Sequence, residues 1–288
     1  MRTQELAPAK INLALDILGR RADGYHGLRM VMQTVSLCDV ITVEEGGTGF
    51  TLLTGEAFSL PADKVSMEQR AAEAFFTALG VPVPPLTVRL EKNIPAYAGL
   101  GGGSADVAAL LRCLRRLYAA GMPDEALRAI GLTVGSDVPF CVSGGTSLAE
   151  GRGERLTDLP PLPVCQIVLC KPDFGISTPE LFVLADGAVL SKRPDIAGLT
   201  AALQGGELTG VTDRLCNVFE EFLPERYREV FRIKESLLAH GALNAAMSGS
   251  GPTVYGIFES AAEAQRAAEV LKKSYQQTYV AKSVKKLV

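Results

Sequence analysis

The chain lacks tryptophan, and aromatic residues make up only 6% of it. An extended platform of rings for stacking nucleic-acid bases is therefore not expected. Positive charge is not in excess either, because 29 Lys and Arg stand against 32 Asp and Glu and leave a formal net charge of −3. This balance argues against attraction to nucleic acid or to an anionic membrane surface.

Metal-ligating residues are also sparse. The chain has two histidines, His26 and His240, and no two of its six cysteines stand in a C-x-x-C spacing. A structural zinc site needs clustered ligands, so the sequence predicts no protein metal site. The cysteines are expected to be small buried side chains in a reducing cytosol.

Long apolar runs are missing from the chain. No segment approaches the roughly 20 apolar residues that cross a bilayer, and the N-terminal residues MRTQE contain no apolar signal core. The sequence therefore predicts a cytoplasmic protein that contacts neither membrane nor nucleic acid, as a monomer or a homodimer.

Hydrophobic residues are plentiful, at 47% of 288 residues, which is ordinary for a globular protein. The length suggests about two domains of roughly 150 residues each. Composition shifts over 144–159, just before the proline-rich segment 159–163. We therefore expect an N-terminal domain over 1–150 and a C-terminal domain over 151–288.

Hydrophobic periodicity predicts an α+β fold. Residues 11–17 alternate between apolar and smaller or polar side chains, as in a half-buried strand. Further strands are predicted at 29–45, 49–54, 86–91, 164–170, 243–247, 253–258 and 278–284. Helices are predicted at 63–79, 104–119 and 225–239, and after the capping box of Ser260 and Glu263. This order favours an antiparallel sheet with helices on one face in the second half.

A glycine-rich loop at 93–106, NIPAYAGLGGGSAD, lies between a predicted strand and a predicted helix. Successive glycines let the backbone approach an anion, and the helix N-terminus supplies free N–H donors and partial positive charge. The pattern fits a di- or triphosphate. The alternative is a helix-capping turn that binds nothing.

Two familiar phosphate motifs do not match this loop. A P-loop needs Gly-Lys-Ser/Thr at its end, whereas this loop ends Gly103-Ser104-Ala105. The dinucleotide fingerprint needs a glycine where Ser104 stands. An NAD-binding oxidoreductase remains a weaker rival.

If phosphate is transferred, the lysine that a P-loop would supply must come from elsewhere in the chain. Lys10 stands at the head of the first strand, and the alternation places Lys10 and Asn12 on the same face. Asp137 precedes Val138, Pro139 and Phe140, so it is expected to be partly buried and to need a cationic partner such as Lys10. The alternatives are a solvated lysine and a helix-capping aspartate.

Several motifs resemble those of the GHMP small-molecule kinases. They are the loop at 95–105 and the segments 8–13 (PAKINL), 19–26 (GRRADGYH), 135–140 (GSDVPF), 151–154 (GRGE) and 248–253 (SGSGPT). The resemblance spans almost the whole chain. The GRRADGYH segment makes it closer to those members that phosphorylate a cytidyl-linked alcohol.

The resemblance implies a fold and a set of site residues. The fold would be α+β, with an N-terminal ribosomal-protein-S5-like domain and a C-terminal ferredoxin-like sandwich. Lys10 and Asp137 would be the catalytic pair, and ATP would bind with Mg²⁺. The ATP phosphates would lie on Pro95, Ala96, Tyr97, Ala98, Gly99, Leu100, Gly101, Gly102, Gly103, Ser104 and Ala105. The alcohol substrate would contact Asn12, Tyr25, His26 and Phe182, with the cytosine between the Tyr25 and Phe182 rings and His26 at its polar edge.

The chain departs from the family pattern at three places. Tyr97 stands where the family usually has a small residue, Ala105 replaces a frequent serine, and residues 63–65 replace a common Asn-Leu-Val. Two other functions stay open: a kinase for another small alcohol, of homoserine or mevalonate type, and a non-catalytic nucleotide-binding protein.

Overall fold

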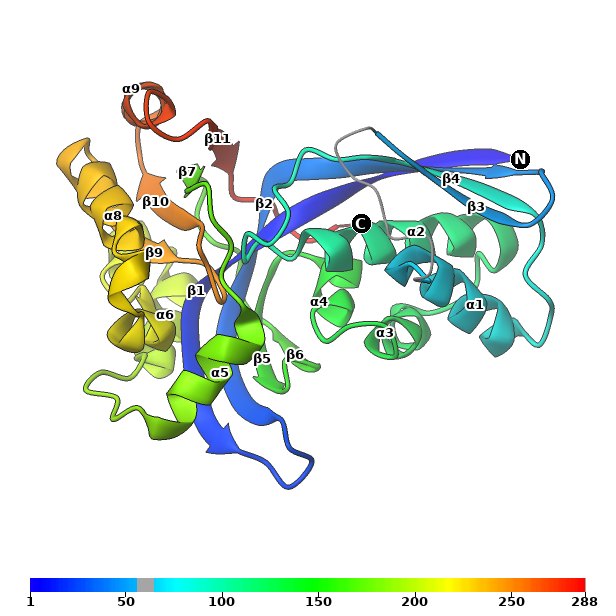
Figure 1. Cartoon of the computed structure of the whole chain (residues 1–288), viewed down its shortest axis with the longest axis horizontal. Coiled ribbons are helices and arrows are strands. Elements are labelled where there is room, and N and C mark those ends of the chain that lie inside the picture. The colour runs from blue at the N-terminus through cyan, green and yellow to red at the C-terminus, as the bar shows by residue number, and fades with distance from the viewer. Residues whose placement is uncertain (56–64, 288) are drawn as a thin grey trace.

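A computed structural model describes residues 1–55 and 65–287 (Figure 1). Two sheets organise these residues. The larger has seven strands, with the order β3-β4-β2-β1-β8 and with β5 and β6 attached to β2, and the smaller has four strands in the order β11-β7-β10-β9. The predicted α+β class is confirmed.

The first half of the chain is built on a long antiparallel hairpin of β1 and β2. The strands of the larger sheet are β1 (Arg2–Arg20), β2 (His26–Glu45), β3 (Phe50–Thr54), β4 (Leu86–Glu91), β5 (Thr146–Gly151), β6 (Arg155–Asp158) and β8 (Cys216–Asn217). The helices of the first half are α1 (Met67–Leu79), α2 (Gly102–Tyr118), α3 (Asp124–Leu132) and α4 (Val138–Ser143). These four helices lie together against one face of the sheet, with α2 packed directly on β1 and β2 (Figure 1).

The second half carries the smaller, antiparallel sheet. Its strands are β7 (Gln166–Lys171), β9 (Asn244–Met247), β10 (Val254–Phe258) and β11 (Gln277–Lys282). Its helices are α5 (Thr178–Gly187), α6 (Ile196–Gly205), α7 (Leu208–Thr212), α8 (Glu229–Ala239) and α9 (Ala261–Lys272), with 3₁₀ turns η1 (Val218–Phe222) and η2 (Glu225–Tyr227). Helix α8 packs on β9 and β10, and α9 packs on β7 and β11, as expected for a sandwich with helices on one face.

Strand β1 differs from the prediction of a half-buried strand. Both faces are buried over 7–17, where Asn12 is only 1% exposed. Helix α2 packs against this strand. The second half covers it further, and the Tyr255 hydroxyl in β10 donates a hydrogen bond to the Asn12 carbonyl at 2.8 Å. Lys10 and Asn12 therefore face the interior of the molecule and not bulk solvent.

Helix α1 begins later than predicted. Its N-cap is Ser66, whose hydroxyl accepts the N–H of Gln69, and residues 63 and 64 lie outside the described part of the chain. Val65 precedes the helix and is exposed. The inner face of the helix includes Ala72 and Phe75, which are fully buried.

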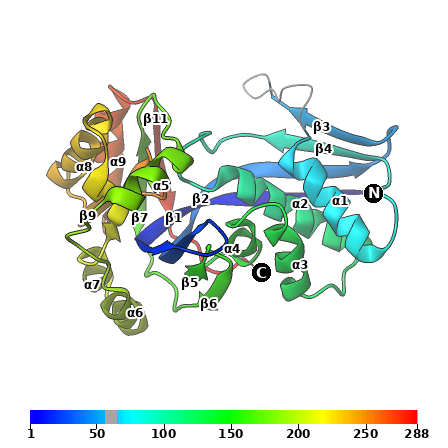
Figure 2. The ribbon, with the colours of Figure 1, turned by 60° about the horizontal axis from the view of Figure 1, so that its bottom comes forward.

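The beginning and the end of the second half both contact the first half. Strand β6 pairs with β5 beyond residue 150, so the larger sheet extends past the predicted boundary, which stays a prediction. The C-terminal segment returns to the first half through bridges of Ser283 to Val35 and Lys286 to Gly144, and ends beside α4 (Figure 2). Among the described helices, none is long and apolar enough to cross a membrane.

Candidate active site

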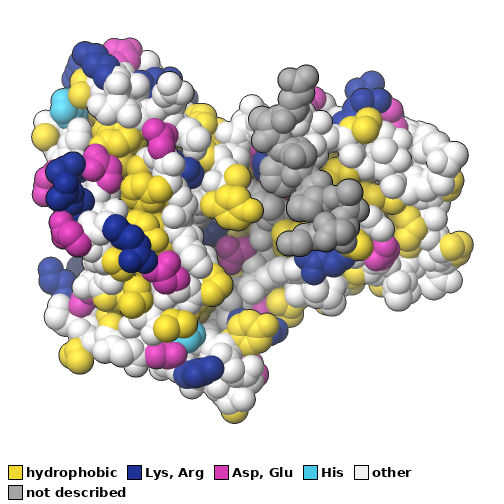
Figure 3. Space-filling model, viewed as in Figure 1, with side chains coloured by type: hydrophobic (Ala, Val, Ile, Leu, Met, Phe, Trp, Pro, Cys, Tyr) yellow, Lys and Arg dark blue, Asp and Glu magenta, His cyan; other side chains and the backbone are white. Residues whose placement is uncertain are grey.

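A cavity of about 690 Å³ opens where the two halves meet, and the surface is hollowed between them (Figure 3). The first half supplies residues from β1, β2, the glycine loop and the β5–β6 turn, and the second half supplies α5 and the turn at 249–251. Most of the predicted side chains meet here. The lining includes Lys10, Tyr25, His26, Tyr97, Gly99, Gly101, Ser104, Asp137 and Phe182.

Lys10 lies at the floor of this cavity with two oxygen neighbours. Its Nζ donates to Asn12 Oδ1 at 2.8 Å and lies 3.4 Å from Asp137 Oδ2. The Lys10 side chain is only 6% exposed, whereas that of Asp137 is 28% exposed. The alternative of a solvated lysine is wrong, and an ammonium and a carboxylate share the end of the cavity next to the glycine loop.

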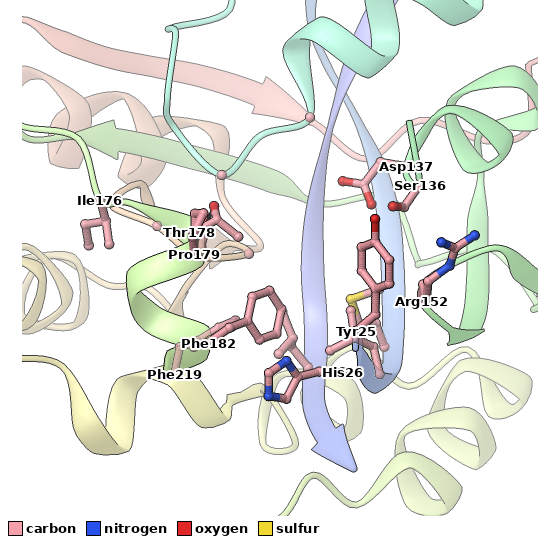
Figure 4. A pocket seen from close by; sticks show the side chains of 18 of the residues that line it. Tyr25, His26, Ser136, Asp137, Arg152, Ile176, Thr178, Pro179, Phe182 and Phe219 are labelled. Carbon is pink, nitrogen blue, oxygen red and sulfur yellow. Dashed lines mark hydrogen bonds between the residues drawn. The ribbon is translucent and has the colours of Figure 1, made fainter. Parts of the chain in front are cut away.

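Asp137 stands at the N-cap position of α4, but its side chain makes no capping hydrogen bond. The capping alternative therefore does not account for this carboxylate. The β5–β6 turn lies close by, because a Cβ built on Gly153 would be 3.9 Å from Asp137 Oδ1. The carboxylate is left facing Lys10 and the cavity (Figure 4).

The glycine loop is clamped between β1 and the turn at 248–251. The Lys10 N–H donates to the Leu100 carbonyl at 2.9 Å, and the Ser248 hydroxyl donates to the Gly99 carbonyl at 2.9 Å. Gly99 has a φ of +74°, and a Cβ there would lie 2.1 Å from the Ser248 carbonyl oxygen. Gly101 has a φ of +69°, and a Cβ there would lie 3.0 Å from Lys10 Cγ. These two glycines are required by conformation and by space.

Helix α2 begins directly after this loop without a side-chain cap. Its N-cap is Gly101, and its first turn holds no acidic residue. The backbone N–H groups at this end are free donors at the positive end of a 17-residue helix. Not every predicted loop residue faces the cavity, since Ala98, Leu100 and Ala105 are buried in the core and anchor the loop from behind.

Tyr97 is unusual within the loop. Its φ of +52° is the one positive value at a non-glycine residue among the described positions. The side chain is 85% exposed and reaches the cavity lining. The backbone there is one that glycine adopts freely, which explains the small residue expected at this position.

The aromatic side chains lie on opposite sides of the cavity (Figure 4). His26 stacks on Phe182, with ring centroids 4.7 Å apart and a 15° interplanar angle, and its Nε2 lies 2.7 Å from Asp186 Oδ1. The expected position of His26 at the edge of a base stays a prediction. Tyr25 stands across the cavity with a 56% exposed side chain.

Several lining residues were not assigned a role from the sequence. They are Arg20, Ser136, Arg152, Ile176, Thr178, Asp186, Phe219 and Ser250. Thr178 and Ser250 hydroxyls lie 2.6 Å apart and join α5 to the glycine turn. Arg20 and Arg152 belong to the motifs at 19–26 and 151–154, so the sequence signalled the segments but not which side chains reach the cavity.

Three ionisable side chains lie behind the loop. Asp39 is fully buried and accepts the Ile94 N–H at 2.7 Å, and Lys92 contacts both Asp39 and Asp106. The Lys92 ammonium thus contacts two carboxyl groups. Burial raises the pKa of Asp106 to about 8, with Asp39 adding to the shift and Lys92 opposing it. Asp106 Oδ1 has no hydrogen-bond partner among the described residues.

The cysteines are free thiols in the described residues. Cys113, Cys141, Cys165 and Cys170 are buried as expected, whereas Cys38 and Cys216 are half-buried. Burial raises the pKa of the Cys141 thiol to about 12, so it stays protonated and unreactive at neutral pH. No cluster of three or more His, Cys, Asp or Glu side chains that could hold a metal occurs in the described ranges.

Two family models match the chain. The GHMP kinases N terminal domain covers residues 66–145, and the GHMP kinases C terminal model covers residues 200–277. The chain thus belongs to the GHMP kinases, and the resemblance drawn from the motifs is confirmed.

Curated relatives of the chain show which kind of GHMP kinase it resembles. The chain is 37% identical over 278 residues to the 4-diphosphocytidyl-2-C-methyl-D-erythritol kinase of Clostridium acetobutylicum, covering 96% of this chain and 99% of the relative. It is 40% identical to the same enzyme of Clostridium perfringens, covering 93% of each chain. The chain belongs to the 4-diphosphocytidyl-2-C-methyl-D-erythritol kinase family.

Solved structures agree with this family. A crystal structure of 4-(cytidine 5′-diphospho)-2C-methyl-D-erythritol kinase matches with a TM-score of 0.82 and 32% identity, covering 98% of this chain and 99% of the other. A homoserine kinase from Cytophaga hutchinsonii matches with a TM-score of 0.75 and 20% identity, covering 99% and 95%. The second likeness shows the fold alone.

Proposed function

We propose that the protein transfers the γ-phosphoryl group of ATP to the 2-hydroxyl of 4-diphosphocytidyl-2-C-methyl-D-erythritol, giving the 2-phosphate and ADP. This reaction belongs to the non-mevalonate isoprenoid pathway, and we place it in the cytoplasm. The observation that carries the proposal is a single cavity. It joins the Lys10–Asp137 pair, the uncapped start of α2 and the rings of Tyr25 and Phe182.

Asp137 is proposed to accept the proton of the attacking hydroxyl. A hydroxyl is a weak nucleophile at neutral pH, so a positioned carboxylate that takes its proton assists the transfer. Lys10 Nζ, 3.4 Å from Asp137 Oδ2, offsets the charge of the carboxylate and would contact the γ-phosphate. Asn12, which accepts a hydrogen bond from Lys10, holds the ammonium in place and would lie beside the erythritol portion.

The glycine loop is proposed to hold the ATP phosphates. The transition state of phosphoryl transfer spreads negative charge over the equatorial oxygens, so preorganised donors contribute most of the stabilisation. The free N–H groups at the start of α2 supply such donors without a competing acidic side chain.

The site fits Mg²⁺ carried by ATP. Mg²⁺ is usually held by one or two protein oxygens together with phosphates and water. Ser104, in the first turn of α2, lines the cavity and would supply a hydroxyl ligand. When bound there, the ion would neutralise charge on the phosphate oxygens.

A coupled ADP-release assay tests the proposed substrate against the alternatives. The purified protein is given ATP, Mg²⁺ and, in separate reactions, the cytidyl-erythritol substrate, homoserine or mevalonate. We expect ADP release that depends on the cytidyl substrate. Preference for homoserine or mevalonate would support a kinase for another alcohol, and ATP binding without ADP release with any alcohol would support a non-catalytic nucleotide-binding protein.

A further inference from the structure

Two arginines line the cavity without a carboxylate partner. Neither the Arg20 nor the Arg152 side chain forms an ion pair within the described ranges, although both line the cavity near Tyr25. Neighbouring arginines are paired, since Arg21 lies 3.1 Å from Asp23 and Arg29 lies 3.6 Å from Glu150. The pKa of Asp23 is lowered mainly by its hydrogen bond to Arg21 and also by the charge of Arg152, so Asp23 is the carboxylate that Arg152 senses from beyond ion-pair distance. The donors of Arg20 and Arg152 are not used in an ion pair within the described residues.

Strand register holds both arginines beside the end of the β1–β2 hairpin. Arg20 is opposite His26 in the β1–β2 ladder, and Leu28 is opposite Gly151 in the β2–β5 ladder. The β5–β6 turn that carries Arg152 thus starts next to the hairpin end. The Glu154 carboxylate accepts the Arg152 N–H inside this turn, so that acid is engaged with the backbone.

The guanidinium of Arg152 lies against the Tyr25 ring. Its Cζ lies 4.8 Å from the centroid of the Tyr25 ring, in cation–π contact. The next residue, Gly153, faces Asp137 Oδ1. Figure 4 shows Arg152 beside Tyr25 and close to Ser136, on the side of the cavity away from Phe182. The Arg152 guanidinium therefore lies at the Tyr25 ring, and the backbone of the same turn reaches Asp137.

We propose that Arg152 and Arg20 form an anion subsite for the diphosphate that joins the base and the alcohol of the substrate. The inference rests on the proposed function, which puts the cytosine at Tyr25 and the reacting hydroxyl at Asp137. The linking diphosphate must then pass along the β5–β6 turn. Arginine suits this task, because its planar fork matches two phosphate oxygens and stays charged at all physiological pH values.

Direct binding of fragments tests the subsite. Dissociation constants of cytidine and of cytidine diphosphate are measured by calorimetry, with the ATP site filled by a non-hydrolysable ATP analogue. We expect the wild type to bind cytidine diphosphate about 10- to 100-fold more tightly than cytidine, the range of charge-assisted hydrogen bonds. In the double variant Arg20→Gln/Arg152→Gln the ratio should fall to nearly one, whereas Arg29→Gln, which alters a paired arginine nearby, should keep it.

Two results would overturn the inference. An unchanged ratio in the double variant would mean that the arginines do not bind the diphosphate. An equal loss for cytidine and cytidine diphosphate would mean that Arg152 only supports Tyr25. The proposed function is judged separately by turnover of the complete substrate in the wild type, so a failure of the subsite and a failure of the function are distinguishable.

Discussion

Phe182 combines two roles in one ring. It stacks on His26 and meets Phe219 edge to face, with ring centroids 5.3 Å apart, and it also lines the cavity. Stacking of a base on an aromatic side chain contributes about 1–3 kcal/mol. Truncating a phenylalanine to alanine in a core costs about 3–5 kcal/mol of stability, so the two roles must be separated by a variant that disturbs only the packing.

Phe222 offers that comparison, because it also meets Phe219 edge to face, at 5.7 Å, but does not line the cavity. Phe182→Ala and Tyr25→Ala should raise the KM for the cytidyl substrate by about 5- to 150-fold, since each 1.4 kcal/mol is about tenfold. The KM for ATP should stay nearly constant. Phe222→Ala should lower the melting temperature and leave both KM values unchanged. A lower melting temperature with an unchanged KM for the cytidyl substrate in Phe182→Ala would show that the Phe182 ring does not bind the substrate.

Single residues were predictable where their sequence neighbours form a specific motif. Lys10 and Asp137 were singled out this way, and the structure brings their side chains together. The contact of Arg152 with Tyr25 was not predictable, because it depends on the pairing of Leu28 with Gly151 in a sheet whose register no local pattern specifies. The stacking of His26 on Phe182 joins two halves of the chain and was missed for the same reason.

At the scale of elements, the loop before α2 depends on the conformation of Gly101. Gly80, the C-cap of α1, has almost the same φ, +71° against +69°, but a Cβ there would meet nothing within 4 Å. Both positions carry the same backbone strain when substituted. Only at Gly101 would the added Cβ press on Lys10.

Gly101→Ala and Gly80→Ala should each cost about 1–2 kcal/mol of stability, the cost of a left-handed conformation for a residue with a Cβ. Only Gly101→Ala should also lower kcat/KM, by about 10- to 100-fold, because small misplacements at a reacting centre are costly. Denaturant unfolding and steady-state kinetics on the same preparations check this. Equal activities of the two variants would show that the loop does not position Lys10.

The buried group of Asp39, Lys92 and Asp106 joins β2, the β4–α2 connection and α2. It makes the free energy of unfolding depend on pH. Burial raises the pKa of Asp106 to about 8, from about 3.9 in an unfolded chain. The folded protein therefore holds a proton that the unfolded chain has released between these values. The stabilisation that this bound proton provides is fully present at low pH and is lost as the pH rises through about 8.

Asp106→Asn should remove this dependence. The wild-type free energy of unfolding should fall between pH 5 and pH 8 by up to about 1.4 kcal/mol per pH unit from this group, and the variant should show a flatter profile. Urea unfolding at several pH values measures both. Asp158→Asn, at an exposed carboxylate paired with Lys286, serves as the control and should retain the wild-type slope. A variant as pH-dependent as the wild type would refute the protonated state of Asp106.

Elements with clear periodicity and caps were predicted well, and others were not. Helix α9 begins after Ser260 as its capping box indicates, and β4 has the predicted bounds. Helices α4 to α7 were missed because prolines, glycines and near-uniform apolar character hide the helical period in short segments. The full burial of β1 was not predictable, because part of its cover comes from residues more than 200 positions later.

At the scale of the whole molecule, the cavity exists only because both halves of the chain meet. His26 of β2 stacks on Phe182 of α5, and the Ser248 hydroxyl holds the Gly99 carbonyl across the same boundary. The proposed catalytic pair, in contrast, comes from the first half alone. The two-domain class was predictable from the motifs, whereas the return of the C-terminal segment to α4 was not.

The central claim is that Asp137 and Lys10 carry phosphoryl transfer to the cytidyl-linked alcohol. Its most direct test is transfer of labelled γ-phosphate from ATP to that alcohol by the wild type, Asp137→Asn, Lys10→Met and the double variant, with ATP affinity measured on each. We expect Asp137→Asn to transfer label about 10²- to 10⁴-fold more slowly with ATP affinity retained, and the double variant to lose much less than the product of the single losses. Transfer by Asp137→Asn within threefold of the wild type would contradict the account.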